Sequence, residues 1–512
     1  MALASTTVFE ARPGVGSATN GGGFVPGSSG TDWSQQNAAQ YALTNGSATT
    51  GSATINTTSA VADMVGNITY VAGGTGSITG GWYQILSQVT GTSITLDRST
   101  GLVTGTGVTL NIGGALDLWA TAEPLLTAGM TLWIKATGTT TLTTNFILSA
   151  TGDSTSGPIT VAGYHTTRGD HDGTRPIFTS ATNSVDIVRN AASSNLVFRI
   201  FDNLEISSTA GTPGNGFTGG TVSGLGLFWK ISNCYIHGVK NGVIGDVLTY
   251  NQLTNLTVVN SEITGCTNDA VLNCDKMTFD GCYLHGNSGY GVEYKTVGRT
   301  TTNSAYPVVF RNTVVYSNSL GGIYIQSAAG GAATNGPYLD VARCVIRGNT
   351  NDGIQIAIAN GKLVILALEN NKIYGNSGYG VNITNAAAMI FVNRNNAYGS
   401  NTSGPRNNLA AGTNDVTLTA DPDTNASGND FTNNSTAGGG AACKASGFPG
   451  SIPGLAAAGF SDIGALQAVG FANILCPPRR VYVSRTMTTI RRFPGAAVLP
   501  PPVLISSIRK VR

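Results

Sequence analysis

One line of this sequence is written almost twice. "CYLHGNSGYGVEY" at residues 282–294 returns as "NKIYGNSGYGVNI" at residues 371–383. Such self-similarity is typical of repeat proteins, in which each copy forms one unit that cannot bury its apolar face alone. Six segments align on one apolar residue at intervals of 21–31 residues: Ile236, Ile263, Leu284, Val315, Ile346 and Ile373.

Each copy carries the pattern of short strands joined by sharp bends. Apolar residues seven and five positions before the anchor share one face of a strand. The position three before the anchor is Asn or Gly in five of the six copies, as at Gly281 and Asn312, and both residue types tolerate a left-handed bend. A glycine such as Gly291 or Gly353 precedes the next strand. Because stacked copies form ladders about 4.8 Å apart, we predict an all-β right-handed parallel β-helix; a β-sandwich would not keep Asn and Gly in register.

The clarity of the repeat sets the expected domain boundaries. The coils are clearest over residues 225–385, and we expect the whole β-helix to span 151–468. Residues 1–29 are expected to form an N-terminal arm. Residues 30–150 are expected to form a small β domain that also caps the β-helix. Residues 469–512 are expected to form a basic, proline-containing C-terminal arm.

Composition excludes several kinds of protein. The net charge of +2 gives no reason to expect a nucleic-acid partner, and we expect no membrane segment and no leader peptide. Cys234 and Cys282 lie two coils apart, about 9.6 Å and too far for a disulfide. No zinc-ligand spacing is present among the seven cysteines. We therefore expect a reducing assembly compartment and no cofactor.

The outward positions beside the anchor form a candidate binding strip. Its aromatic and basic side chains could stack on sugar rings or on a neighbouring subunit. No catalytic residue is assigned; Glu262 is a weak candidate for a catalytic acid, and ordinary outer-face polarity is the favoured interpretation. A glycosidase needs two carboxylates, and the sequence predicts no clear convergence of Glu262 with Asp269, Asp280 or Glu293. The strip comprises Tyr235, His237, Tyr283, His285, Tyr316, Arg347 and Tyr374.

Two further segments carry charge. Asp170 and Asp172 in "RGDHDGTRP" are weak candidates for calcium ligands, and the alternative is that they cap a loop. The C-terminal arm is expected to order against a partner, or else to be a frayed terminus. The candidate anchoring residues of that arm are Arg479, Arg480, Arg485, Arg491 and Arg492.

Both ends of the predicted β-helix carry a family resemblance. "VFEARPGVGSATNGGGFVPGSSGTDWSQQNAAQY" near the start and "NDFTNNSTAGGGAACKASGFPG" near the end resemble segments of β-helix virion surface proteins of tailed bacteriophages. The resemblance covers roughly residues 8–468. It implies a homotrimer on the virion surface, assembled in the host cytoplasm and in contact with the major capsid protein or other virion proteins.

Within that family the sparse acids favour a non-enzymatic role. We expect a capsid decoration (cement) or head-spike protein. The alternative is a tail spike that binds or depolymerises host surface polysaccharide. A secreted bacterial carbohydrate enzyme is a third interpretation, which the expected absence of a leader peptide disfavours.

Overall fold

The computed structural model describes most of the chain up to residue 465. The C-terminal arm, with its five candidate arginines, lies outside the described residues. The described residues are 3–76, 78–101, 104–191, 198–219, 228–245, 255–274, 276–295, 307–327, 335–358, 363–384, 388–444, 446–447 and 462–465.

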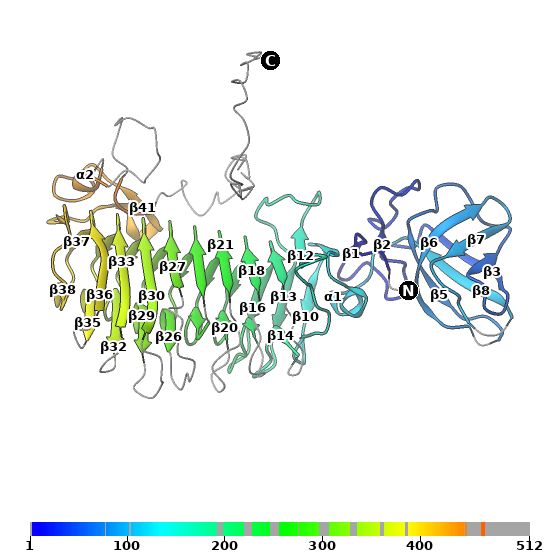
Figure 1. Cartoon of the computed structure of the whole chain (residues 1–512), viewed down its shortest axis with the longest axis horizontal. Helices are drawn as coiled ribbons and strands as arrows, with labels where there is room; N and C mark the ends of the chain where they lie inside the picture. Colours follow the sequence, from blue (N-terminus) through cyan, green and yellow to red (C-terminus); the bar gives the residue numbers. More distant parts are fainter. Residues whose placement is uncertain are drawn as a thin grey trace, which may run out of the picture. The chain divides into compact units, whose positions relative to one another are not determined.

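The structure confirms the predicted fold: a right-handed parallel β-helix of three sheets (Figure 1). Each complete coil contributes one strand to each sheet, and strands of successive coils pair in parallel. The first sheet contains, in spatial order, β2 (Gly23–Phe24), β1 (Val8–Ala11), β9 (Thr131–Lys135), β12 (Ile159–Tyr164), β15 (Arg199–Asp202), β18 (Trp229–Ser232), β21 (Leu256–Val259), β24 (Met277–Asp280), β27 (Pro307–Arg311), β30 (Asn335–Ala342), β33 (Leu363–Glu369) and β36 (Ala388–Arg394).

The other two sheets follow the same order along the axis. The second sheet contains β10 (Thr139–Thr141), β13 (Ile177–Ser180), β16 (Glu205–Ser208), β19 (Tyr235–His237), β22 (Glu262–Thr264), β25 (Tyr283–His285), β28 (Val314–Tyr316), β31 (Val345–Arg347), β34 (Lys372–Tyr374), β37 (Ala397–Gly399) and β39 (Val416–Thr417). The third contains β11 (Ile147–Leu148), β14 (Val188–Asn190), β17 (Phe217–Thr218), β20 (Val243–Ile244), β23 (Val271–Leu272), β26 (Tyr290–Lys295), β29 (Gly321–Ser327), β32 (Ile354–Ile358), β35 (Tyr379–Thr384) and β38 (Gly404–Asn407).

The repeat residues take the places that their pattern predicts. The anchor residues pair with one another along the second sheet and are fully buried. The bend between the first and second sheets is left-handed in every described coil from Asn203 to Asn395, with φ between 48° and 65°. Even Arg343 adopts this conformation, with φ 54°. The break in strand alternation before each anchor therefore corresponds to a real change of chain direction.

The N-terminal region is arranged differently from the predicted domains. The first coil begins with β9 at Thr131, before the expected boundary at residue 151, and β1 from the predicted arm pairs in parallel with β9. The small β domain is a closed barrel with its own core. It comprises β3 (Tyr41–Ala48), β4 (Thr54–Asn56), β5 (Ile68–Ala72), β6 (Gly81–Val89), β7 (Ser93–Leu96) and β8 (Gly105–Ile112).

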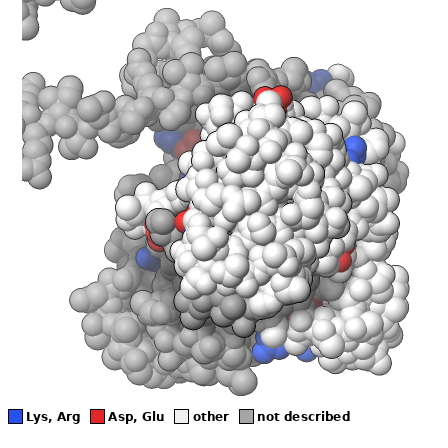
Figure 2. Space-filling model, turned by 90° about the vertical axis from the view of Figure 1, so that its right-hand side faces the viewer, with Lys and Arg blue, Asp and Glu red and all other residues white. Residues whose placement is uncertain are grey.

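The barrel is nearly devoid of charge. Between residues 33 and 116 the charged residues are Asp63, Asp97 and Arg98, and the last two form an ion pair at 2.5 Å. Few blue or red atoms appear on the face of the molecule in Figure 2. Barrel closure removes the open strand edges that charged residues would otherwise protect from pairing with other chains.

Two short helices, α1 (Trp119–Ala122) and η1 (Glu123–Leu125), close the first coil. Trp119 is buried against Phe146 and Phe178, with ring centroids 4.7 and 5.4 Å away. The buried carboxylate of Glu123 accepts hydrogen bonds from Trp119 Nε1 and from the guanidinium of Arg199. These helices, rather than the barrel alone, cover the apolar end of the β-helix.

The cysteines behave as core residues. The six described cysteines are free and buried, and burial raises the pKa of Cys234 and Cys282 to about 12. Cys476 lies outside the described residues. Among the helices of the described ranges, none is long and apolar enough to cross a membrane.

Candidate functional site

The second sheet turns two columns of side chains outward, one on each side of the buried anchor. One column runs from Thr139 of β10 through Glu205, Tyr235 and Glu262 to Lys372 of β34. The other begins at Thr141 and contains Ser207, His237, Thr264, His285, Tyr316, Arg347 and Tyr374. All seven residues of the predicted strip therefore do line one sheet.

The columns follow a two-coil alternation between β16 and β25. A strand carrying Glu and a hydroxyl residue is followed by a strand carrying Tyr and His, and the pair of strands then repeats. We call this set the Glu–His ladder: Glu205, Ser207, Tyr235, His237, Glu262, Thr264, Tyr283 and His285.

Each histidine of the ladder contacts the glutamate on the preceding strand. His237 Nε2 lies 3.2 Å from Glu205 Oε1, and His285 Nε2 lies 2.9 Å from Glu262 Oε1. Thr264 Oγ1 lies 3.2 Å from His285 Nδ1, so both nitrogens of that ring have partners. Because every member sits on a strand, these side chains are held without a mobile loop, which lowers the entropy lost on binding a ligand.

The aromatic rings of the ladder also stack. The rings of Tyr235 and His237 lie 4.3 Å apart at 24°. Burial, followed by the neighbouring carboxylates of Glu262 and Glu205, raises the pKa of Tyr235. The Tyr235 hydroxyl therefore stays protonated at neutral pH and can donate a hydrogen bond.

Beyond β25 the chain covers its own second sheet. A hairpin of β40 (Asp423–Asn425), η2 (Ala426–Gly428) and β41 (Asp430–Asn433) lies over it, followed by α2 (Gly440–Cys443). Phe431 packs on Tyr316 with ring centroids 4.7 Å apart. Tyr283 packs at the edge of this contact, so the open part of the sheet ends there.

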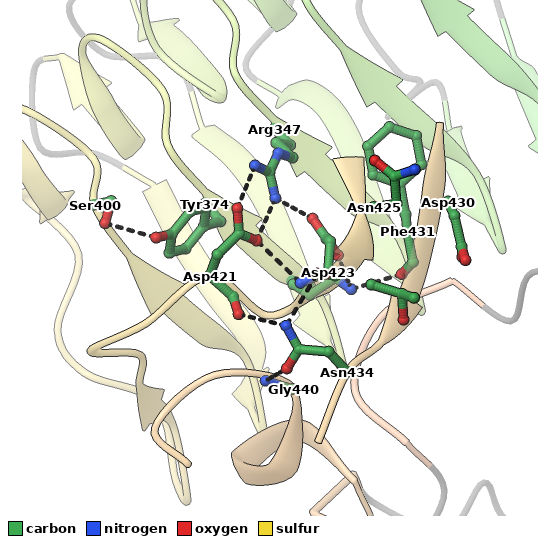
Figure 3. A network of polar contacts seen from close by, with 12 residues as sticks. Arg347, Tyr374, Ser400, Asp421, Asp423, Asn425, Asp430, Phe431, Asn434 and Gly440 are labelled. Atoms are coloured by element: carbon green, nitrogen blue, oxygen red, sulfur yellow. Dashed lines mark hydrogen bonds and ion pairs between the residues drawn. The ribbon is translucent and has the colours of Figure 1, made fainter. Parts of the chain in front are cut away.

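The hairpin is held by a cluster of opposite charges (Figure 3). Arg347 Nη1 lies 2.7 Å from Asp421 Oδ1 and also pairs with Asp423. Lys372, 1% exposed along its side chain, pairs with Asp423 and donates to the carbonyl of Phe431 at 2.7 Å. Burial raises the pKa of Asp423 even though Lys372 and Arg347 oppose that shift.

This cover corrects the prediction for one end of the strip. Tyr316 is buried beneath Phe431, and Arg347 forms ion pairs with Asp421 and Asp423 of the same chain. Tyr374 accepts a hydrogen bond from Ser400 Oγ at 3.0 Å and lies 5.2 Å from the Arg347 guanidinium. These three residues face the chain's own C-terminal segment, whereas Tyr235, His237, Tyr283 and His285 remain at least partly exposed.

The acids near Glu262 differ from the expectation that no two of them converge. Glu262 is bound to His285, whereas Asp269 and Glu293, which the sequence did not bring together, share a side-chain hydrogen bond. Burial, with Glu293 adding to it, raises the pKa of Asp269 to about 7. The pair joins two neighbouring coils. Because Asp269 is only 1% and Glu293 only 8% exposed, a polymer on the surface cannot reach it.

The candidate metal ligands serve the loop that contains them. Asp170 accepts hydrogen bonds from the backbone amides of His165, Thr166 and Thr167. Asp172 Oδ2 lies 2.8 Å from His165 Nδ1. Within the described ranges, no group of three or more His, Cys, Asp or Glu side chains is arranged to hold a metal ion.

Glu205, with Ser207 on the same strand, is the part of the ladder that the repeat alignment missed. Its coil carries the same signals as the others, with Asn203 at the left-handed bend and Ile206 as the buried anchor. The alignment fails because the position seven before that anchor holds Arg199 instead of an apolar residue. Arg199 is tolerated there because it forms a buried ion pair with Glu123 at 2.5 Å.

Comparison with known proteins yields only distant structural neighbours. No family model and no curated protein sequence matches the chain. The structure is similar to that of pectate lyase Pel9A, with 17% identity, a TM-score of 0.45, and coverage of 70% of this chain and 92% of that one. It is also similar to the A-module of Azotobacter vinelandii mannuronan C-5 epimerase AlgE6, with 16% identity, a TM-score of 0.35, and coverage of 56% and 89%. A GH87 α-1,3-glucanase catalytic domain in complex with nigerose is similar at 12% identity and a TM-score of 0.30, with coverage of 79% and 94%.

Proposed function

We propose that the Glu–His ladder binds a polysaccharide chain that runs along the axis of the β-helix. The observation that carries this proposal is the two-coil repeat of the bonded pairs Glu205–His237 and Glu262–His285. Half-buried Tyr235 and Tyr283 lie in the same column as the two glutamates and alternate with them. Adjacent strands lie about 4.8 Å apart. An extended chain of pyranose sugars advances by a similar distance per unit, so each coil would meet one sugar.

The chemistry of the ladder suits sugars. Tyrosine rings cover the apolar face of a pyranose while their hydroxyls hydrogen-bond. Carboxylate oxygens accept hydrogen bonds from sugar hydroxyls, and imidazole nitrogens can donate or accept them. Glu262 retains about a quarter of its side-chain exposure and His237 about a third, so both can reach a ligand on the surface.

The test is binding of the full-length protein to an array of polysaccharides, followed by Tyr235→Ala. We expect the substitution to weaken binding about tenfold, the loss of one ring–sugar contact. Tyr324→Ala is the matched control, because Tyr324 is a similarly half-buried tyrosine on the outer face of the third sheet. Equal loss in both variants, or no loss in Tyr235→Ala, would contradict the ladder as the binding surface.

Depolymerisation of the bound glycan is a second candidate function, and one spacing favours it. Glu205 and Glu262 lie two strands apart in one column, about 9.6 Å by strand spacing. This backbone spacing is close to the upper end of the roughly 6.5–9.5 Å that separates the two carboxylates of inverting glycosidases, and a small tilt of either side chain would bring the carboxylates within that range. If the array identifies a polymer that is shortened, Glu262→Gln should abolish cleavage while the polymer still binds. Unchanged cleavage would remove Glu262 from that role.

We further propose, on the sequence resemblance, that the protein acts on the surface of a tailed-phage particle as a homotrimer. A tail spike fits glycan binding better than a capsid decoration or head spike does. Quantitative mass spectrometry of purified particles tests this. A copy number far below that of the major capsid protein supports a spike, a comparable number supports a decoration, and absence from particles contradicts both.

A further inference from the structure

The Glu–His ladder contains two carboxylates and no lysine or arginine. Its acids are Glu205 and Glu262, and the side chains bonded to them are His237 and His285. Arg175 lies near Tyr235, and its Nε donates to the carbonyl of Asn233 at 2.8 Å. The side chains of the ladder itself offer a ligand two carboxylates and no guanidinium.

Two cations stand further along the same columns but are already neutralised. Lys372 shares a column with Glu262, and Arg347 shares one with His285. Asp423 pairs with both of them from above the sheet, Asp421 pairs with Arg347, and Lys372 is almost fully buried. The hairpin that covers this end of the sheet thus removes the side chains that would recognise an anionic sugar.

Recognition of carboxylated sugars needs paired cationic donors, most often bidentate arginine. A polyuronate would instead bring one carboxylate per sugar alongside Glu205 and Glu262, and like charges placed side by side across an interface are disfavoured. We infer that the Glu–His ladder selects uncharged glycans and rejects polymers of uronic acids. This inference rests on the proposed function and specifies its ligand class.

The experiment compares matched polymers with the full-length protein. Each probe pair consists of a neutral glucan and the same glucan oxidised at C6, so that only CH₂OH and COO⁻ differ, with β-1,4 and α-1,3 linkages both included. We expect the neutral member to bind at least tenfold more tightly at low ionic strength. The preference should shrink as salt is raised, because salt screens repulsion between exposed charges.

Variants assign the selectivity to the ladder. Replacing both glutamates, Glu205→Gln with Glu262→Gln, should reduce the neutral-to-oxidised affinity ratio several-fold. Asp63→Asn is the control, because Asp63 is an exposed acid on a barrel loop. The salt series on the unmodified protein tests the same point without any variant.

The outcomes separate the two proposals. Equal or tighter binding of the oxidised glucans at low salt overturns the selectivity, while glycan binding itself stands. Retention of the full affinity ratio in the double variant also overturns it. If the unmodified protein binds neither member of any pair nor any glycan on the array, the proposed function itself fails.

Discussion

The side-chain amide of Asn349 donates from Nδ2 to Oδ1 of Asn376, 2.9 Å away on the next coil. The same bond joins each neighbouring pair in a ladder of five asparagines at the turn after the second sheet, of which the first four are buried and the last is partly exposed: Asn287, Asn318, Asn349, Asn376 and Asn401. Each Oδ1 also accepts from the backbone amide of the equivalent residue in the preceding coil, as Asn376 Oδ1 does from Asn349 N at 3.1 Å and Asn287 Oδ1 does from Cys266 N at 3.0 Å. The turn is thus a continuous hydrogen-bonded column.

Replacing Asn349 should therefore destabilise the β-helix strongly. In Asn349→Leu, Asn318 loses the acceptor for both its backbone amide and its Nδ2, and each buried group left unpaired costs about 1–3 kcal/mol. We expect a loss of roughly 3 kcal/mol or more in the free energy of unfolding, measured by denaturant titration. Asn351→Ala, at an exposed position two residues later, is the control and should change stability by less than about 0.5 kcal/mol.

The bend asparagine Asn312 gives a second prediction. Its φ is 49°, and its side chain bonds Asp280 and Arg343 on the coils before and after. Asn312→Gly and Asn312→Val lose the same side-chain bonds, but only valine also resists the left-handed backbone. Valine should be less stable than glycine by on the order of 1–2 kcal/mol. Equal thermal midpoints for the two variants would show that the bend imposes no strain.

The sequence predicted the features that repeat and missed those that depend on one long-range contact. The anchors, the left-handed bends and the outward strip all follow from the coil repeat, because equivalent residues of every coil pack in the same way. The pairing of Arg347 with Asp421 joins residues 74 positions apart and occurs once, so no repeated pattern signals it. Asp269 lies in the turn before β23 and Glu293 lies within β26 of the next coil, so they occupy different columns and a column alignment does not bring them together.

The Asp269–Glu293 pair should make stability depend on pH. The folded-state pKa of Asp269, about 7, lies above the usual value near 3.8, so its contribution is complete below that usual value and is lost as pH rises through 7. Such a shift corresponds to on the order of 4 kcal/mol.

Asp269→Asn removes this titration. Relative to Asp269→Asn, the unmodified protein should therefore lose free energy of unfolding as the pH rises from 4 to 8. The pKa of Asp202 is lowered by His171, Ser232 and Asn233 despite its burial, so its effect on the pH dependence of stability has the opposite sign. Asp202 is present in both proteins, and its effect therefore cancels in the difference. A difference that stays constant across this range would contradict the shared proton.

Lys372 decides whether the hairpin stays on the second sheet. Lys372→Met keeps the length of the side chain but leaves buried Asp423 with only Arg347 as a cationic partner, and breaking a buried ion pair costs about 3–5 kcal/mol. Because the hairpin also loses the Lys372 bond to the Phe431 carbonyl, we expect faster amide hydrogen exchange over Asp430–Asn433 while the strands of the β-helix core stay protected. Lys444→Met is the control, because exposed Lys444 contributes one bond to Ser435 Oγ at 3.0 Å. Uniformly faster exchange in every sheet would instead mean that Lys372 stabilises the whole β-helix and that the hairpin does not open on its own.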